Sequence, residues 1–80
     1  MENYHLIEVK YLGTTNSLGS RVKMTSHRLN ESVTIPYDYA LNKVTKMAEN
    51  YLKNKGFAII GQGEAKDVDF IITNDFKSIK

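Results

Sequence analysis

Only one segment of this 80-residue chain has the periodicity of a helix. Over about residues 39 to 55, apolar residues recur at spacings of three and four and form one stripe, as in an amphipathic helix. Asp38 is placed to act as its N-cap. Gly56 suits the left-handed conformation that ends many helices, with Phe57 then able to contact Leu52. We therefore expect one helix with defined ends, and strands elsewhere.

Most of the remaining segments alternate apolar and polar residues with the period of two that is typical of half-buried strands, whereas residues 57–61 are fairly apolar on both faces. The expected strands are residues 6–12, 21–25, 32–35, 57–61 and 68–73. A loop at 13–20 and a glycine-containing turn at 61–67 separate neighbouring strands. The order β-β-β-α-β-β with short connections predicts an α+β fold, a mainly antiparallel sheet with the helix packed on one face. Because 80 residues enclose one thin core, we expect a single domain over 1–80.

Composition and spacing argue against catalysis. The chain has no cysteine, which excludes disulfides, thiolate nucleophiles and cysteine-ligated zinc. His5 and His27 lack metal-ligand spacing, and no nucleophile-elbow pattern surrounds any serine. We expect a protein that is not an enzyme and that has no metal site and no cofactor.

The sequence also predicts where the chain resides. Its start lacks the basic and apolar regions of a secretory signal, and its longest apolar run, residues 57–60, has only four residues. These observations predict a cytoplasmic protein with no membrane association.

Basic residues provide the main functional signal in the sequence. Lys10, Arg21, Lys23 and Arg28 lie at outward positions of the first strands or beside them. If the helix covers the opposite face, these side chains share an open sheet face, with stacking partners from the set Tyr4, Tyr37 and Tyr39. The net charge of only +2 is modest for a nucleic-acid-binding protein.

The loop from Gly13 to Gly19 has two interpretations. It is rich in hydroxyls and amides, includes Asn16, and leads into Arg21 and Lys23. Its backbone amides could hold an anion, or it could be a long hairpin connection, which is the interpretation we favour.

The helix adds a second charged surface. Its exposed face carries four lysines, among them Lys43 and Lys46, against Glu49, whereas residues 57–80 hold three lysines and four acids. The +2 charge therefore conceals a basic helix face and an acidic final hairpin, which together favour a docking surface of two signs. The candidate binding residues are Lys10, Asn16, Arg21, Lys23, Arg28, Tyr37, Tyr39, Lys43 and Lys46.

Three strings carry a resemblance: Lys10-Tyr11-Leu12-Gly13, residues 19–23 (GSRVK) and residues 32–39 (SVTIPYDY). With them the chain, from about Lys10 to Phe76, resembles small uncharacterised accessory proteins of bacteriophages and other bacterial mobile elements. That class includes anti-defence inhibitors such as anti-CRISPR proteins. The resemblance implies a bacterial host cell and a host protein or nucleoprotein complex as the partner.

Three hypotheses follow, in order of preference. The first is a non-catalytic protein that docks on a host complex, such as a defence nuclease, and blocks or modifies it. The second is a nucleic-acid-binding module that uses the basic sheet face. The third is a small-ligand site in the loop from Gly13 to Gly19. A homo-oligomer could also form if an edge strand ending near Pro36 or Thr73 pairs with a second copy.

Overall fold

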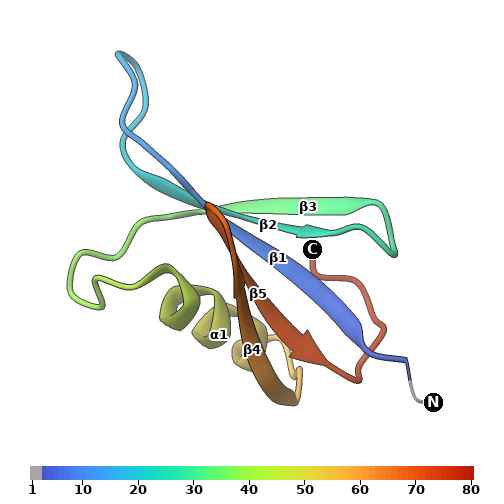
Figure 1. Ribbon diagram of the computed structural model, residues 1–80. Coiled ribbons are helices and arrows are strands. Elements are labelled where there is room, and N and C mark those ends of the chain that lie inside the picture. Colours follow the sequence, from blue (N-terminus) through green and yellow to red (C-terminus); the bar gives the residue numbers. More distant parts are fainter. Residues whose placement is uncertain (1–2) are drawn as a thin grey trace.

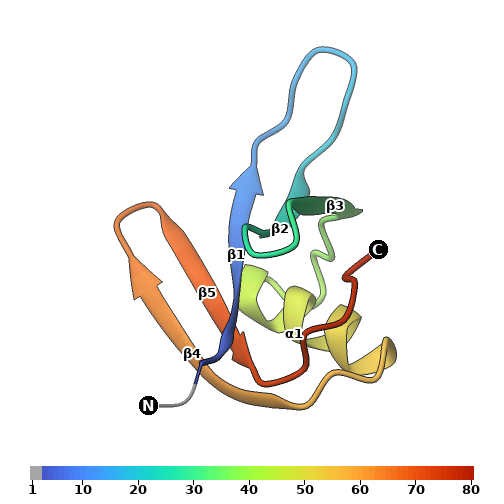
Figure 2. The ribbon, with the colours of Figure 1, turned by 90° about the vertical axis from the view of Figure 1, so that its right-hand side faces the viewer.

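The computed structural model describes residues 3–80, which form one five-stranded antiparallel sheet and one helix (Figure 1). The elements are β1 (His5–Leu12), β2 (Arg21–Ser26), β3 (Glu31–Pro36), α1 (Val44–Asn54), β4 (Ile59–Ala65) and β5 (Val68–Thr73). The strands lie in the order β3-β2-β1-β5-β4, and α1 crosses one face of the sheet (Figure 2). The predicted α+β fold and the order β-β-β-α-β-β are confirmed.

The core lies between α1 and the sheet. Every second residue of the central strands points to the helix, as the register shows by placing Ile7 opposite Ile71 and Val9 opposite Met24. These side chains are almost fully buried and pack against the apolar stripe of the helix. The helical residues of this core are Met47, Ala48 and Leu52. Among residues 3–80, no helix covers the other face of the sheet.

The helix is shorter than the sequence predicted. It begins at Val44 rather than near Tyr39, because Asn42 has a positive φ of 51° that interrupts any helix starting earlier. Asp38 is therefore not the N-cap; Lys43 holds that position without a side-chain cap bond. Within residues 3–80, no helix is long and apolar enough to span a bilayer.

The C-terminal end of the helix agrees with the prediction. Gly56 has a φ of 89°, and its N–H donates to the carbonyl of Lys53 at 3.0 Å. The N–H of Phe57 donates to the carbonyl of Leu52, also at 3.0 Å. These two bonds form a Schellman motif, and both Phe57 and Leu52 are buried in the core.

The predicted turn at 61–67 was wrong. β4 continues through Gly61 and Gly63 to Ala65, and only residues 66 and 67 form the turn. The register places the two glycines opposite Ile72 and Phe70 of β5. A Cβ at Gly61 would lie 3.6 Å from the Cδ1 atom of Ile72, an ordinary van der Waals contact, and a Cβ at Gly63 would meet no atom within 4 Å. The topology also corrects the expected edge near Thr73, since β5 is paired on both sides and the edges are β3 and β4.

The C-terminal segment completes the core. Ile79 is fully buried, whereas Phe76 is 38% exposed and so contributes less to the core. The hydroxyl of Tyr51 donates to the Ile79 carbonyl at 2.7 Å. A carboxylate oxygen of Glu31 accepts from the Ile79 N–H at 3.1 Å. The segment is thus attached to both the helix and the edge strand β3.

We predict that Ile79→Ala lowers the free energy of unfolding by about 2–5 kcal/mol, the usual range for truncating a buried isoleucine. The measurement is urea unfolding followed by circular dichroism. Lys80→Ala is the matched control, because Lys80 is exposed. Equal stability of the two variants would contradict the burial of Ile79.

A polar contact also joins α1 to β4. Glu49 forms an ion pair with Lys53 at 2.6 Å and accepts a hydrogen bond from the amide of Gln62 at 3.0 Å. The hydrogen bond from Lys53, with further attraction from Lys46, holds the pKa of the Glu49 carboxyl below its ordinary value. Because the folded-state pKa is depressed, Glu49 stabilises the fold above its unfolded pKa, and this contribution disappears as the pH falls through the folded pKa.

We predict that Glu49→Gln is less stable than the wild type at pH 7, and that the difference shrinks as the pH falls through the range in which carboxyl groups titrate. Urea unfolding of both proteins between pH 7 and pH 3 measures it. A stability difference that is constant over this range would show that the charge of Glu49 is not responsible.

Candidate binding surface

The face of the sheet that α1 leaves uncovered carries a row of basic side chains. Lys10 of β1 lies directly opposite Lys23 of β2, and Arg21 lies opposite Leu12 at the end of the same pair of strands. Their neighbours along each strand, such as Val9 and Val22, are buried towards the helix, so the basic side chains point the other way. The expectation that Lys10, Arg21 and Lys23 share an open sheet face is therefore met by the geometry.

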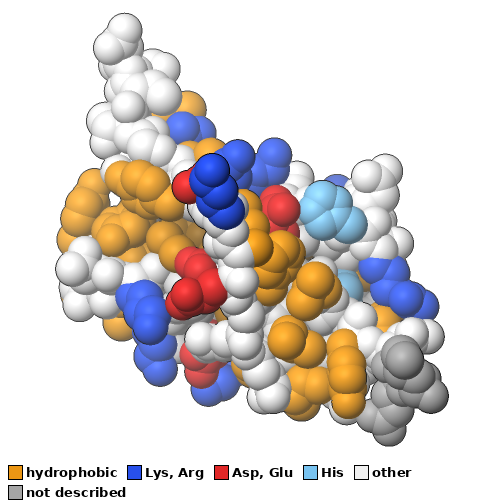
Figure 3. Space-filling model, in the orientation of Figure 1, with side chains coloured by type: hydrophobic (Ala, Val, Ile, Leu, Met, Phe, Trp, Pro, Cys, Tyr) orange, Lys and Arg blue, Asp and Glu red, His pale blue; other side chains and the backbone are white. Residues whose placement is uncertain are grey.

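An apolar surface adjoins this basic row. Leu6 lies opposite Ile72, and Glu8 opposite Phe70, which places the three apolar side chains on the uncovered face. Leu6 is 47% exposed, and Phe70 and Ile72 are half-buried. In Figure 3 apolar side chains gather on the side of the sheet away from the helix, to the right in that view. Sequence reasoning missed this surface, which we call the apolar half of the open face.

Glu8 brings a negative charge to the boundary between the two halves. Its strand neighbours are Thr25 on β2 and Phe70 on β5. Its carboxylate lies 3.5 Å from Nε2 of His27, a residue that is largely exposed. The open face therefore has a basic half and an apolar half, with one acid between them. This arrangement has the features of a protein-binding surface, an apolar area beside charged groups.

The other predicted binding residues lie elsewhere. Tyr37 and Tyr39 follow β3 and line a groove on the helix side of the sheet, so they cannot stack bases above the basic row. Arg28 lies in the turn after β2, with its guanidinium 4.5 Å from the ring centre of Phe76. Lys43 and Lys46 belong to the start of the helix, on the covered side. A nine-residue site is therefore not assembled; three of its residues meet on the open face. Tyr4, which directly precedes β1, is about half exposed.

The loop containing Asn16 is a hairpin arm that projects from the sheet (Figure 1). Its tip is closed by a hydrogen bond of 2.8 Å from the N–H of Thr15 to the carbonyl of Leu18. The Nε–H of Arg21 donates to the carbonyl of Gly19 at 3.1 Å. Asn16 is exposed at the tip, remote from the basic row along both strands. These contacts favour the interpretation of the loop as a hairpin connection.

A serine and a histidine meet inside the protein. Nδ1 of His5 lies 2.8 Å from the backbone carbonyl of Asp75, and Nε2 contacts the hydroxyl of Ser26. Because a carbonyl only accepts, Nδ1 carries a proton and donates to it, while Nε2 forms the second hydrogen bond of the ring with the Ser26 hydroxyl. Ser26 also accepts from the N–H of Leu29 at 3.2 Å. Both side chains are fully buried, and their contacts join β1, β2 and the segment that follows β5.

We predict that Ser26→Ala lowers the free energy of unfolding by about 1–3 kcal/mol, because it leaves buried polar groups of His5 and Leu29 without a partner. Thermal and urea unfolding measure the effect. Ser32→Ala, at an exposed position of β3, is the control and should be nearly neutral. An unchanged stability for Ser26→Ala would contradict the buried network.

No group of three or more potential metal ligands occurs among residues 3–80. The comparisons with known proteins add no family: no family model, no curated protein and no solved structure matches the chain. The interpretation of function therefore rests on the geometry of the open face.

Proposed function

We propose that the chain is a non-catalytic binding protein whose open sheet face docks on an acidic surface of a macromolecular partner. The observation that carries the proposal is the composition of that face, where Lys10, Lys23 and Arg21 adjoin Leu6, Phe70 and Ile72. Buried apolar area supplies affinity at protein interfaces, while the charges steer association and select the partner.

The partner class that we propose is a host protein or nucleoprotein complex, such as a defence nuclease, in a bacterial cell. The signs of the charges limit how docking would occur. The groove in which a nuclease binds nucleic acid is itself basic, because its side chains neutralise phosphates. The basic half of the open face would therefore be repelled from such a groove. The face complements instead an acidic protein surface or the exposed phosphates of a bound nucleic acid. The proposal is therefore one of docking and obstruction beside such a groove, not of imitating the nucleic acid.

Direct nucleic-acid binding is the second candidate. It is favoured by the Lys10–Lys23 pair, where two positive charges face each other across neighbouring strands, with Phe70 of β5 diagonal to Lys10. It is disfavoured by Glu8 in the same face and by the position of Tyr37 and Tyr39 on the other side of the sheet. We rank it below protein binding for these reasons.

We predict that the double variant Lys10→Glu/Lys23→Glu loses partner binding by about tenfold or more, because both charges are reversed at the face that docks. The matched control is Lys43→Glu/Lys46→Glu, which makes the same change in net charge on the covered side. Immobilised wild type and variants are exposed to nuclease-treated bacterial lysate, and the retained proteins are compared and then titrated singly.

The outcomes separate the two candidates. A protein retained by the wild type and the helix control, but lost from the open-face variant, supports docking. If no protein is retained, and oligonucleotides added separately to the immobilised wild type bind with an affinity that falls steeply with salt, support transfers to nucleic-acid binding. Equal loss from both double variants would contradict a role for the open face.

A further inference from the structure

A groove lies on the other side of the sheet, where α1 does not reach the edge strand β3. Among the described elements, α1 packs against β1, β2, β4 and β5 but not against β3. The space between β3 and α1 has a volume of about 710 Å³, within the range of small-molecule sites. Figure 3 shows a hollow rimmed by apolar side chains in this region, to the left. The lining residues used below are Ile35, Tyr37, Asp38, Tyr39, Met47 and Tyr51.

The aromatic side chains that line the groove are held in place by contacts with one another and with residues outside it. The rings of Tyr37 and Tyr39 meet edge to face, with centroids 4.8 Å apart, and Tyr37 packs in the same way on Tyr11 at 5.5 Å. Across the groove, the hydroxyl of Tyr51 is held by the carbonyl of Ile79. Tyr39 is 71% exposed, so much of its ring surface is free to meet a ligand. The groove is thus formed before any ligand enters.

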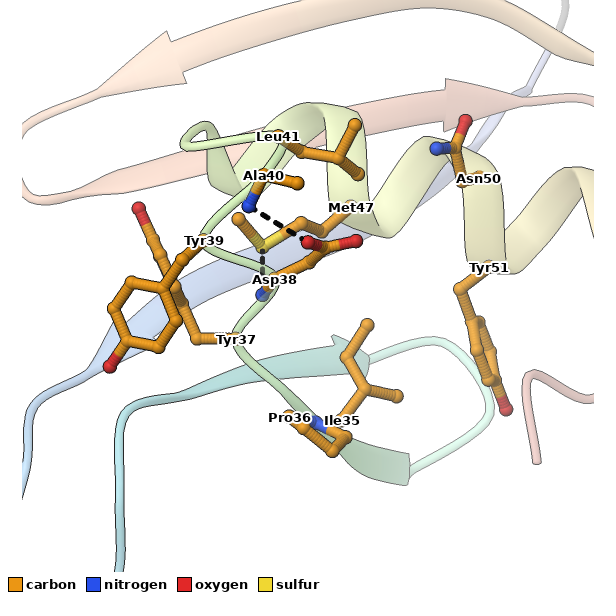
Figure 4. A pocket seen from close by; sticks show the side chains of 10 residues that line it. All are labelled: Ile35, Pro36, Tyr37, Asp38, Tyr39, Ala40, Leu41, Met47, Asn50 and Tyr51. Carbon is orange, nitrogen blue, oxygen red and sulfur yellow. Dashed lines mark hydrogen bonds between the residues drawn. The ribbon is translucent and has the colours of Figure 1, made fainter.

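Asp38 is the one charged residue among those that line the groove. In Figure 4 its carboxylate and the sulfur of Met47 lie between the Tyr37–Tyr39 pair and Tyr51. Its Oδ1 accepts from the N–H of Ala40 at 2.9 Å, and its own N–H contacts the Met47 sulfur at 3.4 Å. Neither ion pair within residues 3–80 involves Asp38. The groove therefore presents a negative charge that no lysine or arginine neutralises at ion-pair distance.

We propose that this groove binds a small organic cation with a planar apolar body. The apolar body would lie against Ile35 and Met47 between the tyrosines, and the cationic group would contact Asp38. Tyrosine faces attract cations as well as apolar surface, so both parts of such a ligand are favoured. An anionic ligand of the same shape would be repelled by Asp38. This site lies across the sheet from the open face, so it is independent of the proposed function.

Three indole compounds of nearly equal shape test the proposal: tryptamine (positive), tryptophol (neutral) and indole-3-acetate (negative). Each is titrated into the full chain, and binding is followed from backbone amide shifts in ¹⁵N–¹H NMR spectra. A ligand of the size of tryptamine should bind with a Kd of about 1 mM. We expect tryptamine to bind about two- to fivefold more tightly than tryptophol, the gain of one exposed charge pair, and indole-3-acetate to bind most weakly.

Two variants and one control locate the site. Asp38→Asn should abolish the preference for tryptamine over tryptophol, and Tyr39→Ala should weaken both; Tyr39 is exposed, so its variant is expected to fold. Lys23→Ala, on the opposite face, should bind tryptamine as the wild type does. Shifts confined to the groove residues with this order of affinities support the proposal. Absence of shifts at 10-fold the expected Kd, equal binding of the three compounds, or an unchanged preference in Asp38→Asn would overturn it.

Discussion

The packing of a single short helix on a wider sheet is the constraint on which the rest of this structure depends. An 11-residue helix is about 16 Å long and about 10 Å wide. Five strands at about 4.8 Å spacing extend roughly 19 Å from one edge to the other. The helix contacts β2, β1, β5 and β4 on one face and leaves the edge strand β3 beyond its reach. Both candidate sites are parts of the sheet that the helix does not cover. One is the opposite face, and the other lies beside β3.

The segments on either side of the helix compensate for its small size. Phe57, placed by the Schellman motif, and Ile79 of the C-terminal segment bury apolar surface that the helix cannot reach. His5 and Ser26 form a hydrogen bond with each other where β1 begins and β2 ends. Among the residues that the structure describes, no buried side-chain nitrogen or oxygen is left without a partner. The small core is thus closed by polar contacts as well as by apolar packing.

The strands and the C-terminal end of the helix could be predicted from the sequence, because both depend on residues close together in the chain. Alternation located four strands, whereas the apolar segment 57–61 gave only part of β4, which is Ile59–Ala65. Gly56 located the end of the helix, because a positive φ there favours glycine over other residues. The start of the helix was wrong because residues 39–41 fit the apolar stripe while Asn42 breaks the backbone. The predicted glycine turn was too long, because the pairing of β4 with β5 runs through Gly61 and Gly63 and the chain turns only at residues 66 and 67.

The composition of the candidate site depended on contacts distant in sequence. Lys10 and Lys23 could be paired from the sequence, because they belong to one hairpin. The sequence did not indicate that Phe70 and Ile72 share this face, since that requires β5 to lie beside β1. The paired residues Leu6 and Ile72 are more than 60 residues apart in the chain. Tyr37 and Tyr39 were assigned to the wrong side, because the course of the chain after Pro36 is set by where the helix must return. Local periodicity carries no information on either point.

The two candidate surfaces differ in sign, which gives the small net charge a structural meaning. Lys10, Arg21 and Lys23 make one half of the open face basic, whereas Asp38 alone supplies charge to the groove on the opposite side. Attraction between exposed charges falls off over about 8–10 Å at ordinary salt, so a partner at either surface responds mainly to the local sign and little to the total of +2. An acidic macromolecule and a small cation could therefore be bound at the same time, each by the side of the sheet that attracts it.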